Sequence, residues 1–256
     1  MMRRTWLLLA VSLSAGAGHP APAQPAADGP SKPLPAWLAF SAEALARADS
    51  ASAFDPEGGG RFYWSRLRAG ASLQPSRWFR VLIEGQDARG ASLGGSGIPA
   101  ALHDPFDLLQ AWAEVGRAET GWRLRIGRQE LALGDERLLG SDRYWDWFGQ
   151  VFDAVRAEYT GHRLHAAAFS GFRVEPSRRR INPFDTASRI AGASLRLETA
   201  GEGELEPFLL WKRGGNTVDL MGRNGHRDVV APGLRAQRSL PWRLDGNFEM
   251  VLERGH

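Results

Sequence analysis

The sequence predicts an all-β fold, an antiparallel up-and-down transmembrane β-barrel of the outer-membrane type that is incomplete, with about 11 strands present. Three observations predict it. Strand-like segments follow one another from Trp37 to the C-terminus, apolar and polar side chains alternate along them, and long and short connections alternate between them. Most segments are about ten residues long, which is the length that a tilted strand needs to cross a bilayer.

The first 23 residues are predicted to be a signal peptide. Arg3 and Arg4 precede an apolar run from Trp6 to Leu13, which is too short to span a bilayer, and small residues end in Ala21-Pro22-Ala23, a pattern that suits signal peptidase. We expect Sec export with cleavage near Ala23, although the arginine pair leaves twin-arginine export as an alternative. Residues 24–36, rich in Pro, Ala and Gly, are predicted to be a periplasmic linker, and residues 37–256 to be the barrel, in the bacterial outer membrane.

The first three expected strands are 37–47, 61–73 and 78–87. Residues 41–47 are strong helix formers, but the alternation of Leu38 and Phe40 with Ser41 and Glu43 favours a strand. In 61–73, Arg66 and Arg68 must turn away from lipid, because an arginine at the bilayer midplane costs about 2–4 kcal/mol. In 78–87, one face carries Phe79, Val81 and Ile83, and the other carries Arg80, Glu84 and Gln86.

The next three expected strands are 107–116, 122–130 and 150–159. In 107–116, an apolar face opposes a polar one, and the two sets are Leu109, Ala111, Ala113 and Val115 against Gln110, Trp112 and Glu114. In the other two strands, polar residues recur at every second position and therefore share one face with the arginines. The side chains expected to point inward there are Arg123, Arg125, Gly127, Gln129, Arg156 and Glu158.

The last five expected strands are 163–172, 189–198, 204–213, 228–237 and 243–254. Two of them alternate most clearly. In 189–198, Ala191, Ala193, Leu195 and Leu197 oppose Ser194, Arg196 and Glu198, and in 243–254, Leu244, Phe248, Met250 and Leu252 oppose Arg243, Asp245, Asn247 and Glu249. A soluble sandwich would alternate as well, so alternation alone does not identify the solvent on each face.

The connections favour a membrane barrel over a sandwich. Those at 48–60, 88–106, 131–149, 173–188 and 214–227 are long, and those at 74–77, 117–121, 160–162, 199–203 and 238–242 are short. All long loops therefore lie at one end of the sheet, as in barrels with short periplasmic turns, whereas a Greek-key sandwich would scatter them. Trp37, Trp78, Trp122 and Trp242 start strands at the short-turn end and predict an aromatic girdle.

A charged hairpin between two of these strands carries three motifs. They are Gly127-Arg128-Gln129-Glu130-Leu131, Gly134-Asp135-Glu136-Arg137-Leu138-Leu139-Gly140 and Phe152-Asp153-Ala154-Val155-Arg156. The hairpin resembles the signature hairpin of the alginate-export family of bacterial outer-membrane porins, and weaker likeness at 82–90 and 166–176 extends the resemblance from about Trp37 to the C-terminus. The resemblance implies a monomeric barrel without a cofactor. In alginate-exporting members, an arginine-lined lumen conducts an anionic polyuronate.

The inward-facing charges are the candidate pore lining. They include more basic than acidic groups, and the leading candidates are Arg66, Arg68, Arg80, Arg123, Arg125, Arg156, Arg196, Glu84, Glu114 and Glu158. Guanidinium groups in a low-dielectric wall can select anions and bind carboxylates with two hydrogen bonds. The alternative is that these side chains pair across strands and only fill the lumen. The predicted function is a channel for an anionic oligo- or polysaccharide.

Two other functions stay open. The first is a periplasmic β-sandwich or small barrel that binds or hydrolyses a glycan, with acids of residues 130–146 as candidates, but nothing in the sequence fixes a separation between two of them, so we expect no enzyme. The second is a structural outer-membrane protein with a plugged lumen. The absence of cysteine excludes thiolate sites, and His162 and His165 lie across a turn, so we expect no metal.

The expected partners are outer-membrane lipid, the saccharide and periplasmic export proteins, and we expect no nucleic acid. The net charge of +3 is compatible with binding an anionic partner. An odd strand number and the lack of a terminal aromatic residue indicate the N-terminal portion of a larger barrel.

Overall fold

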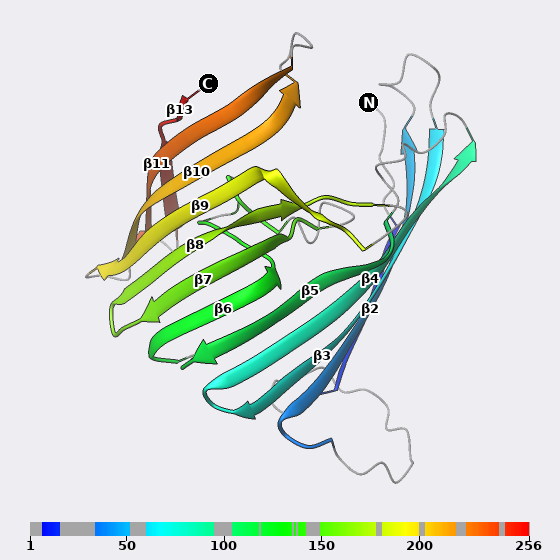
Figure 1. Ribbon diagram of the computed structural model, residues 1–256, viewed down its shortest axis with the longest axis horizontal. Helices are drawn as coiled ribbons and strands as arrows, with labels where there is room; N and C mark the ends of the chain where they lie inside the picture. Colours follow the sequence, from blue (N-terminus) through cyan, green and yellow to red (C-terminus); the bar gives the residue numbers. More distant parts are fainter. Residues whose placement is uncertain are drawn as a thin grey trace.

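The protein forms one antiparallel β-sheet. The computed structural model describes residues 7–15, 34–51, 60–94, 104–117, 119–134, 136, 138–141, 149–177, 181–199, 203–218, 224–240 and 244–255. Strands β1 to β12 lie in sequence order, each hydrogen-bonded to the next, and the short β13 pairs with β11. Figure 1 shows them side by side as one strongly curved sheet whose colours run from blue to red. No helix among the described residues is long and apolar enough to cross a membrane.

The strand bounds follow the expected segments closely. They are β1 Leu7–Ala15, β2 Leu38–Ala51, β3 Gly60–Ser76, β4 Phe79–Gly94, β5 Asp104–Gly116, β6 Gly121–Gln129, β7 Phe152–Thr160, β8 Leu164–Val174, β9 Phe184–Thr199, β10 Gly203–Val218, β11 Asn224–Leu240, β12 Leu244–Val251 and β13 Arg254–Gly255. The 11 expected strands correspond to β2 through β12. Residues 41–47 are extended as expected, because pairing with β3 along the whole of β2 outweighs local helix propensity.

The rhythm of long and short connections is confirmed. Short connections join β3 to β4, β5 to β6 and β7 to β8, and the connections at the other end are longer. Several strands continue at that other end: β4, β9 and β10 each have 16 residues, more than a bilayer requires. The hairpins therefore project beyond the expected hydrocarbon layer on the long-loop side, which is the extracellular side of an outer-membrane barrel.

Strand β1 pairs with β2 along the register Leu7 to Ala48 through Ala15 to Phe40. It contains the apolar run that was assigned to the signal peptide. Pairing within the chain does not test cleavage, so the signal peptide stays a prediction. Most of the expected linker, residues 24–33, lies outside the described residues.

The two faces of the sheet are inverted relative to a soluble protein. Ile83 and Leu67 are 52% and 58% exposed, whereas Arg66 and Arg68 are only 2% and 3% exposed. Charged side chains are rarely so buried in soluble proteins, and large apolar side chains seldom cover a whole face. This distribution is the one that hydrocarbon outside and a polar lumen inside require.

One expected face is wrong at a single position. Leu109 was placed on the lipid face with Ala111, Ala113 and Val115, but it is 2% exposed and packs with Val151 and Val174. A register shift in the β4–β5 pairing, between Glu84 and Gly85, marks a β-bulge at this point. A bulge adds one residue to one strand and reverses the side on which the next residues point.

Three of the four expected girdle tryptophans lie within the described residues. Trp37, Trp78 and Trp122 are exposed, beside the short-turn end of the sheet, and the Trp122 ring lies 5.0 Å from the Tyr159 ring. Trp242 lies outside the described residues.

Candidate functional site

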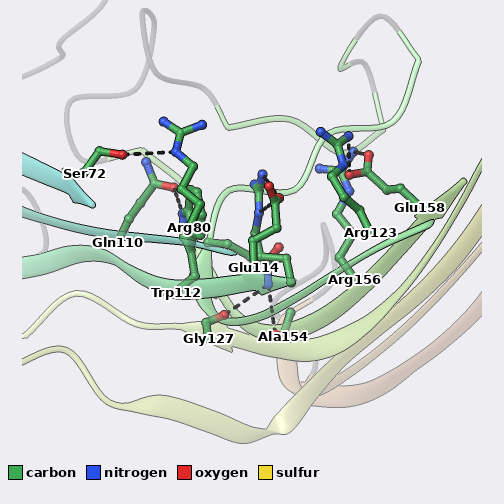
Figure 2. A network of polar contacts seen from close by, with 12 residues as sticks. Ser72, Arg80, Gln110, Trp112, Glu114, Arg123, Gly127, Ala154, Arg156 and Glu158 are labelled. Carbon is green, nitrogen blue, oxygen red and sulfur yellow. Dashed lines mark hydrogen bonds and ion pairs between the residues drawn. The ribbon is translucent and has the colours of Figure 1, made fainter. Parts of the chain in front are cut away.

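A row of charged side chains crosses four neighbouring strands on the polar face. Arg80 on β4 lies opposite Glu114 on β5, Glu114 opposite Arg125 on β6, and Arg125 opposite Arg156 on β7. Figure 2 shows Arg80, Glu114 and Arg156 standing on one side of the sheet. Neighbouring strands are about 4.8 Å apart, so the row places charges at regular steps around the wall.

Glu114 and Glu158 of this face each bind at least one guanidinium group. Both Nε and Nη2 of Arg125 donate to Glu114 Oε2, at 2.9 and 2.6 Å. Glu158 is shared, because Arg123 Nη2 donates to its Oε2 at 2.7 Å and Arg156 Nη2 donates to its Oε1 at 2.6 Å. Two cations on one anion leave a surplus positive charge.

A second shared carboxylate lies on β10. Glu206 Oε2 is 3.3 Å from Arg235 Nη1 and 3.7 Å from Arg196 Nη2. Arg196 therefore lies beside a carboxylate of the next strand, and its place in the pore lining stays a prediction.

The two shared carboxylates border one cavity of about 270 Å³. Arg123, Arg156 and Arg196 line it together with Glu158, Glu206 and His165. Loop residues 132–134 also contribute to its wall. A polar hollow of this size with surplus positive charge can accept an anionic group, because guanidinium groups bind carboxylates with short, charge-assisted hydrogen bonds.

Trp112 organises the part of the row that lies on β4 to β6. Its ring centroid is 4.0 Å from the guanidinium carbon of Arg125 and 5.5 Å from that of Arg80. Its indole N–H donates to Gln110 Oε1 at 3.2 Å, and Gln110 Nε2 donates to Glu84 Oε2 at 2.8 Å. The ring is thus fixed by a hydrogen-bonded chain that ends at the expected pore-lining Glu84, a role for Trp112 that alternation alone did not predict.

Arg66 and Arg68 lie deeper in the wall. Arg66 Nη2 donates to Glu43 Oε1 at 2.6 Å, and Arg68 Nε donates to Gln86 Oε1 at 2.7 Å. Both arginines are buried, so their arrangement matches the cross-strand filler interpretation better than direct contact with a permeant.

The signature hairpin residues form a structural clamp where β6 and β7 meet the long loop. Gly127 has φ of +125°, and an added Cβ would lie 2.3 Å from the Ala111 carbonyl oxygen, so only glycine fits. Gln129 is fully buried and donates to the carbonyl oxygens of Gly127 and Ala154. Phe152 is buried in the principal apolar cluster.

Arg128 completes this clamp on the opposite face. Its Nε and Nη2 donate to the two carboxylate oxygens of Asp153 at 2.9 and 3.1 Å. It also donates to the backbone oxygens of Leu108 and Asn182, which ties β5 and the β8–β9 loop to the same point. Of the remaining motif residues, Asp135 and Arg137 lie outside the described residues, and Glu130 and Gly134 belong to the loop.

The long loop turns back onto the polar face, which the sequence analysis did not predict. Leu131, Leu133 and Leu139 are buried against inward-facing apolar residues of β7 to β11, namely Phe152, Ala154, Phe169, Ile190, Phe208, Leu210 and Ala231. Lys212 on β10 donates to the Leu138 carbonyl oxygen. A Cβ added to Gly149 would lie 3.2 Å from Arg68 Nη2, and one added to Gly134 would lie 3.6 Å from Arg235 Cδ. The loop therefore reaches from β3 to β11 across the lumen side.

The leucines were the available signal for this inward fold. The first half of the connection holds four leucines among charged residues, and so many leucines are unfavourable in water at a barrel rim. Trp145, Trp147 and Phe148 of the same connection lie outside the described residues.

Among the described residues, no two carboxylates of the long loop are seen to face each other as a catalytic pair would. Glu136 accepts hydrogen bonds from the backbone and hydroxyl of Ser141, which is a turn-stabilising role. Asp142 and Asp146 lie outside the described residues. Among the residues that the structure describes, no three His, Asp or Glu side chains come together in a way that could hold a metal ion.

Comparison with known proteins gives one match. A family model described as alginate export matches residues 36–256. Neither the search of curated proteins nor the search of solved structures gave a match.

Proposed function

The chain belongs to the alginate export family, and from that membership we propose that it forms an outer-membrane channel for an anionic oligo- or polysaccharide, with a lumen lined by the arginines of β4 to β11. The family is one of outer-membrane transport porins and not of enzymes. The choice of permeant and the role of the individual arginines are the parts that we propose.

The observation that carries the proposal is the sharing of carboxylates. Arg123 and Arg156 share Glu158, and with Arg196 and Glu206 they line a common cavity that holds three guanidinium groups and two carboxylates. A wall with equal numbers of positive and negative groups would not attract a passing anion. A carboxylate that two arginines share leaves a net positive charge and still holds both arginines in place.

Conduction requires many weak contacts in place of one strong one. An ion must bind well enough to enter each position and weakly enough to leave it. Arg123, Arg125 and Arg156 already use part of their hydrogen-bonding capacity on glutamate, so the N–H groups that remain can bind a saccharide carboxylate only weakly.

Channel function also requires paired sheet edges. In the described residues β1 and β12 are the two ends of the strand order and do not pair with each other. An unpaired backbone group in hydrocarbon costs several kcal/mol, so the conducting form must have both edges paired.

Ion selectivity is the direct test. The full-length protein in a planar bilayer under a KCl gradient should give a reversal potential on the anion-selective side. Replacing Arg123 and Arg125 together by Gln should move that potential toward zero. The matched control is Arg89→Gln, because Arg89 is exposed on the opposite face and pairs with Asp87. A cation preference that the double replacement leaves unchanged would contradict the proposal.

A second candidate function rests on the inward loop. Because Leu131, Leu133 and Leu139 seat the loop against the lumen wall, the protein could be an outer-membrane protein with a closed lumen. Such a protein would fractionate with the membrane and conduct nothing as long as the loop residues 132–141 are present.

A further inference from the structure

Arg80 differs from the other arginines of the cross-strand row. Arg125 and Arg156 each have a carboxylate within ion-pair distance. Arg80 donates from Nε to the Ser72 hydroxyl at 3.0 Å, and its guanidinium group lies over the Trp112 ring, but no carboxylate of the described residues pairs with it. Its two terminal nitrogens accordingly form no hydrogen bond within the described part of the chain. Figure 2 shows them pointing away from the sheet.

The neighbour that could neutralise Arg80 is already bound. Glu114 lies directly opposite Arg80 on β5, but Arg125 holds its Oε2 with two hydrogen bonds. Trp112 places one indole ring beside both guanidinium groups and is fixed by Gln110. The ring therefore packs against both guanidinium groups, while Glu114 stays bound to Arg125 and leaves Arg80 without its cross-strand partner.

Arg80 lies near the short-turn end of the sheet, which is the expected periplasmic end. It is the second residue of β4, directly after the turn that contains Arg77 and Trp78. Arg77 and Arg117, from two adjacent turns, flank the Trp78 ring at 5.9 and 4.4 Å, and neither has a carboxylate partner among the described residues. Three arginines therefore lie close to the short-turn end of β4 and β5.

We propose that Arg80 is the first anion-binding position inside the periplasmic mouth, and that Trp112 is the positioning residue that keeps its guanidinium group available. The proposal rests on the proposed channel function and adds a location and a direction to it. The two free terminal nitrogens present the paired N–H geometry that a carboxylate accepts, so the ligand is one carboxylate of an anionic saccharide. Arg77 and Arg117 would raise the local concentration of that anion by electrostatic steering.

Side-specific block of single channels tests the position of Arg80. The full-length protein is inserted from one side of a planar bilayer, and trigalacturonate is added to either compartment. Arg80→Gln should lower the association rate of trigalacturonate from the periplasmic side by roughly three- to tenfold, because one charge supplies only part of the roughly 10- to 1,000-fold steering effect of a whole charged cleft. The rate from the extracellular side should not change. Arg80→Lys, which keeps the charge, should retain most of the rate, and Arg89→Gln should behave as the wild type.

The outcomes separate the inference from the function on which it rests. If the wild type prefers cations or does not conduct, the channel proposal fails. If the wild type prefers anions and Arg125→Gln reduces that preference, but Arg80→Gln matches the wild type from both sides, only the Arg80 proposal is overturned.

Trp112 is tested by the contrast between an aromatic and an aliphatic replacement. Trp112→Phe keeps a ring face and should keep the periplasmic association rate within about twofold of the wild type, because a phenyl ring still attracts a guanidinium group. Trp112→Leu should lower the rate as Arg80→Gln does, since Arg80 could then approach Glu114. A Trp112→Leu channel with the wild-type rate would overturn the positioning role, and heat-dependent mobility in gel electrophoresis would establish that each variant is folded.

Discussion

Replacing Ile83 by arginine should destabilise the folded protein by an amount that only a hydrocarbon environment can produce. Ile83 lies on the exposed apolar face of β4, five residues into the strand from the short-turn end. An arginine on the lipid face at the bilayer midplane costs about 2–4 kcal/mol. That penalty multiplies the unfolding equilibrium constant by roughly 30- to 800-fold, since about 1.4 kcal/mol corresponds to a factor of ten. In water, the same change at an exposed position would stay within about 0.5 kcal/mol.

The measurement is urea unfolding of the protein in lipid vesicles, followed by tryptophan fluorescence. Phe79→Arg is the matched control, because Phe79 lies on the same face of the same strand but next to the turn. The cost there should fall to about 0–1 kcal/mol, because the arginine reaches the interface. Equal effects at Ile83 and Phe79, or a change below 0.5 kcal/mol at Ile83, would refute the assignment of this face to lipid.

Three further predictions concern the hairpin and its loop. Gly127→Ala should cost about 2 kcal/mol or more in the same unfolding assay, because both the positive φ and the contact with the Ala111 carbonyl oppose a Cβ. Gly121→Ala, with positive φ but open space around it, should cost less, and equal costs would rule out the contact as the cause. Arg128→Leu should cost about 2–4 kcal/mol, because it leaves Asp153 and two backbone oxygens without their donor; the double change with Asp153→Leu should recover part of this loss, and purely additive costs would contradict the coupling. Leu139→Asp should release the inward loop and raise the single-channel conductance, whereas Ala132→Asp at an exposed position of the same loop should not; unchanged conductance in the Leu139 variant would mean that the loop does not narrow the lumen.

The strands and their faces could be predicted because they depend on local periodicity. In β4, the alternation of Phe79, Val81 and Ile83 with Arg80 and Glu84 specifies both the strand and its orientation, and the lipid cost of arginine excludes the other register. The loop lengths then indicate which end of the sheet is extracellular and which is periplasmic. These signals lie within a few residues of one another, so one sequence is sufficient to read them.

The position of Leu109 and the path of the long loop could not be predicted in the same way. The bulge that buries Leu109 is a property of two paired strands, and nothing in β5 alone identifies it. The loop leucines are visible in the sequence, but their partners Phe169, Phe208 and Leu210 lie on strands far along the chain. Alternation assigned Arg123, Arg156 and Glu158 to one face, yet which carboxylate serves which arginine depends on distances between strands that the sequence does not contain.

The apolar seat of the inward loop separates two properties of the lumen that respond to different conditions. Dissolved salt shortens the reach of the guanidinium charges, from about 10 Å at 0.1 M to about 3 Å at 1 M. It does not weaken the burial of Leu131, Leu133 and Leu139, which holds the loop in place. If the protein conducts anions as we propose, its aperture should stay the same as the salt concentration changes, while its selectivity for anions falls at high salt and rises at low salt.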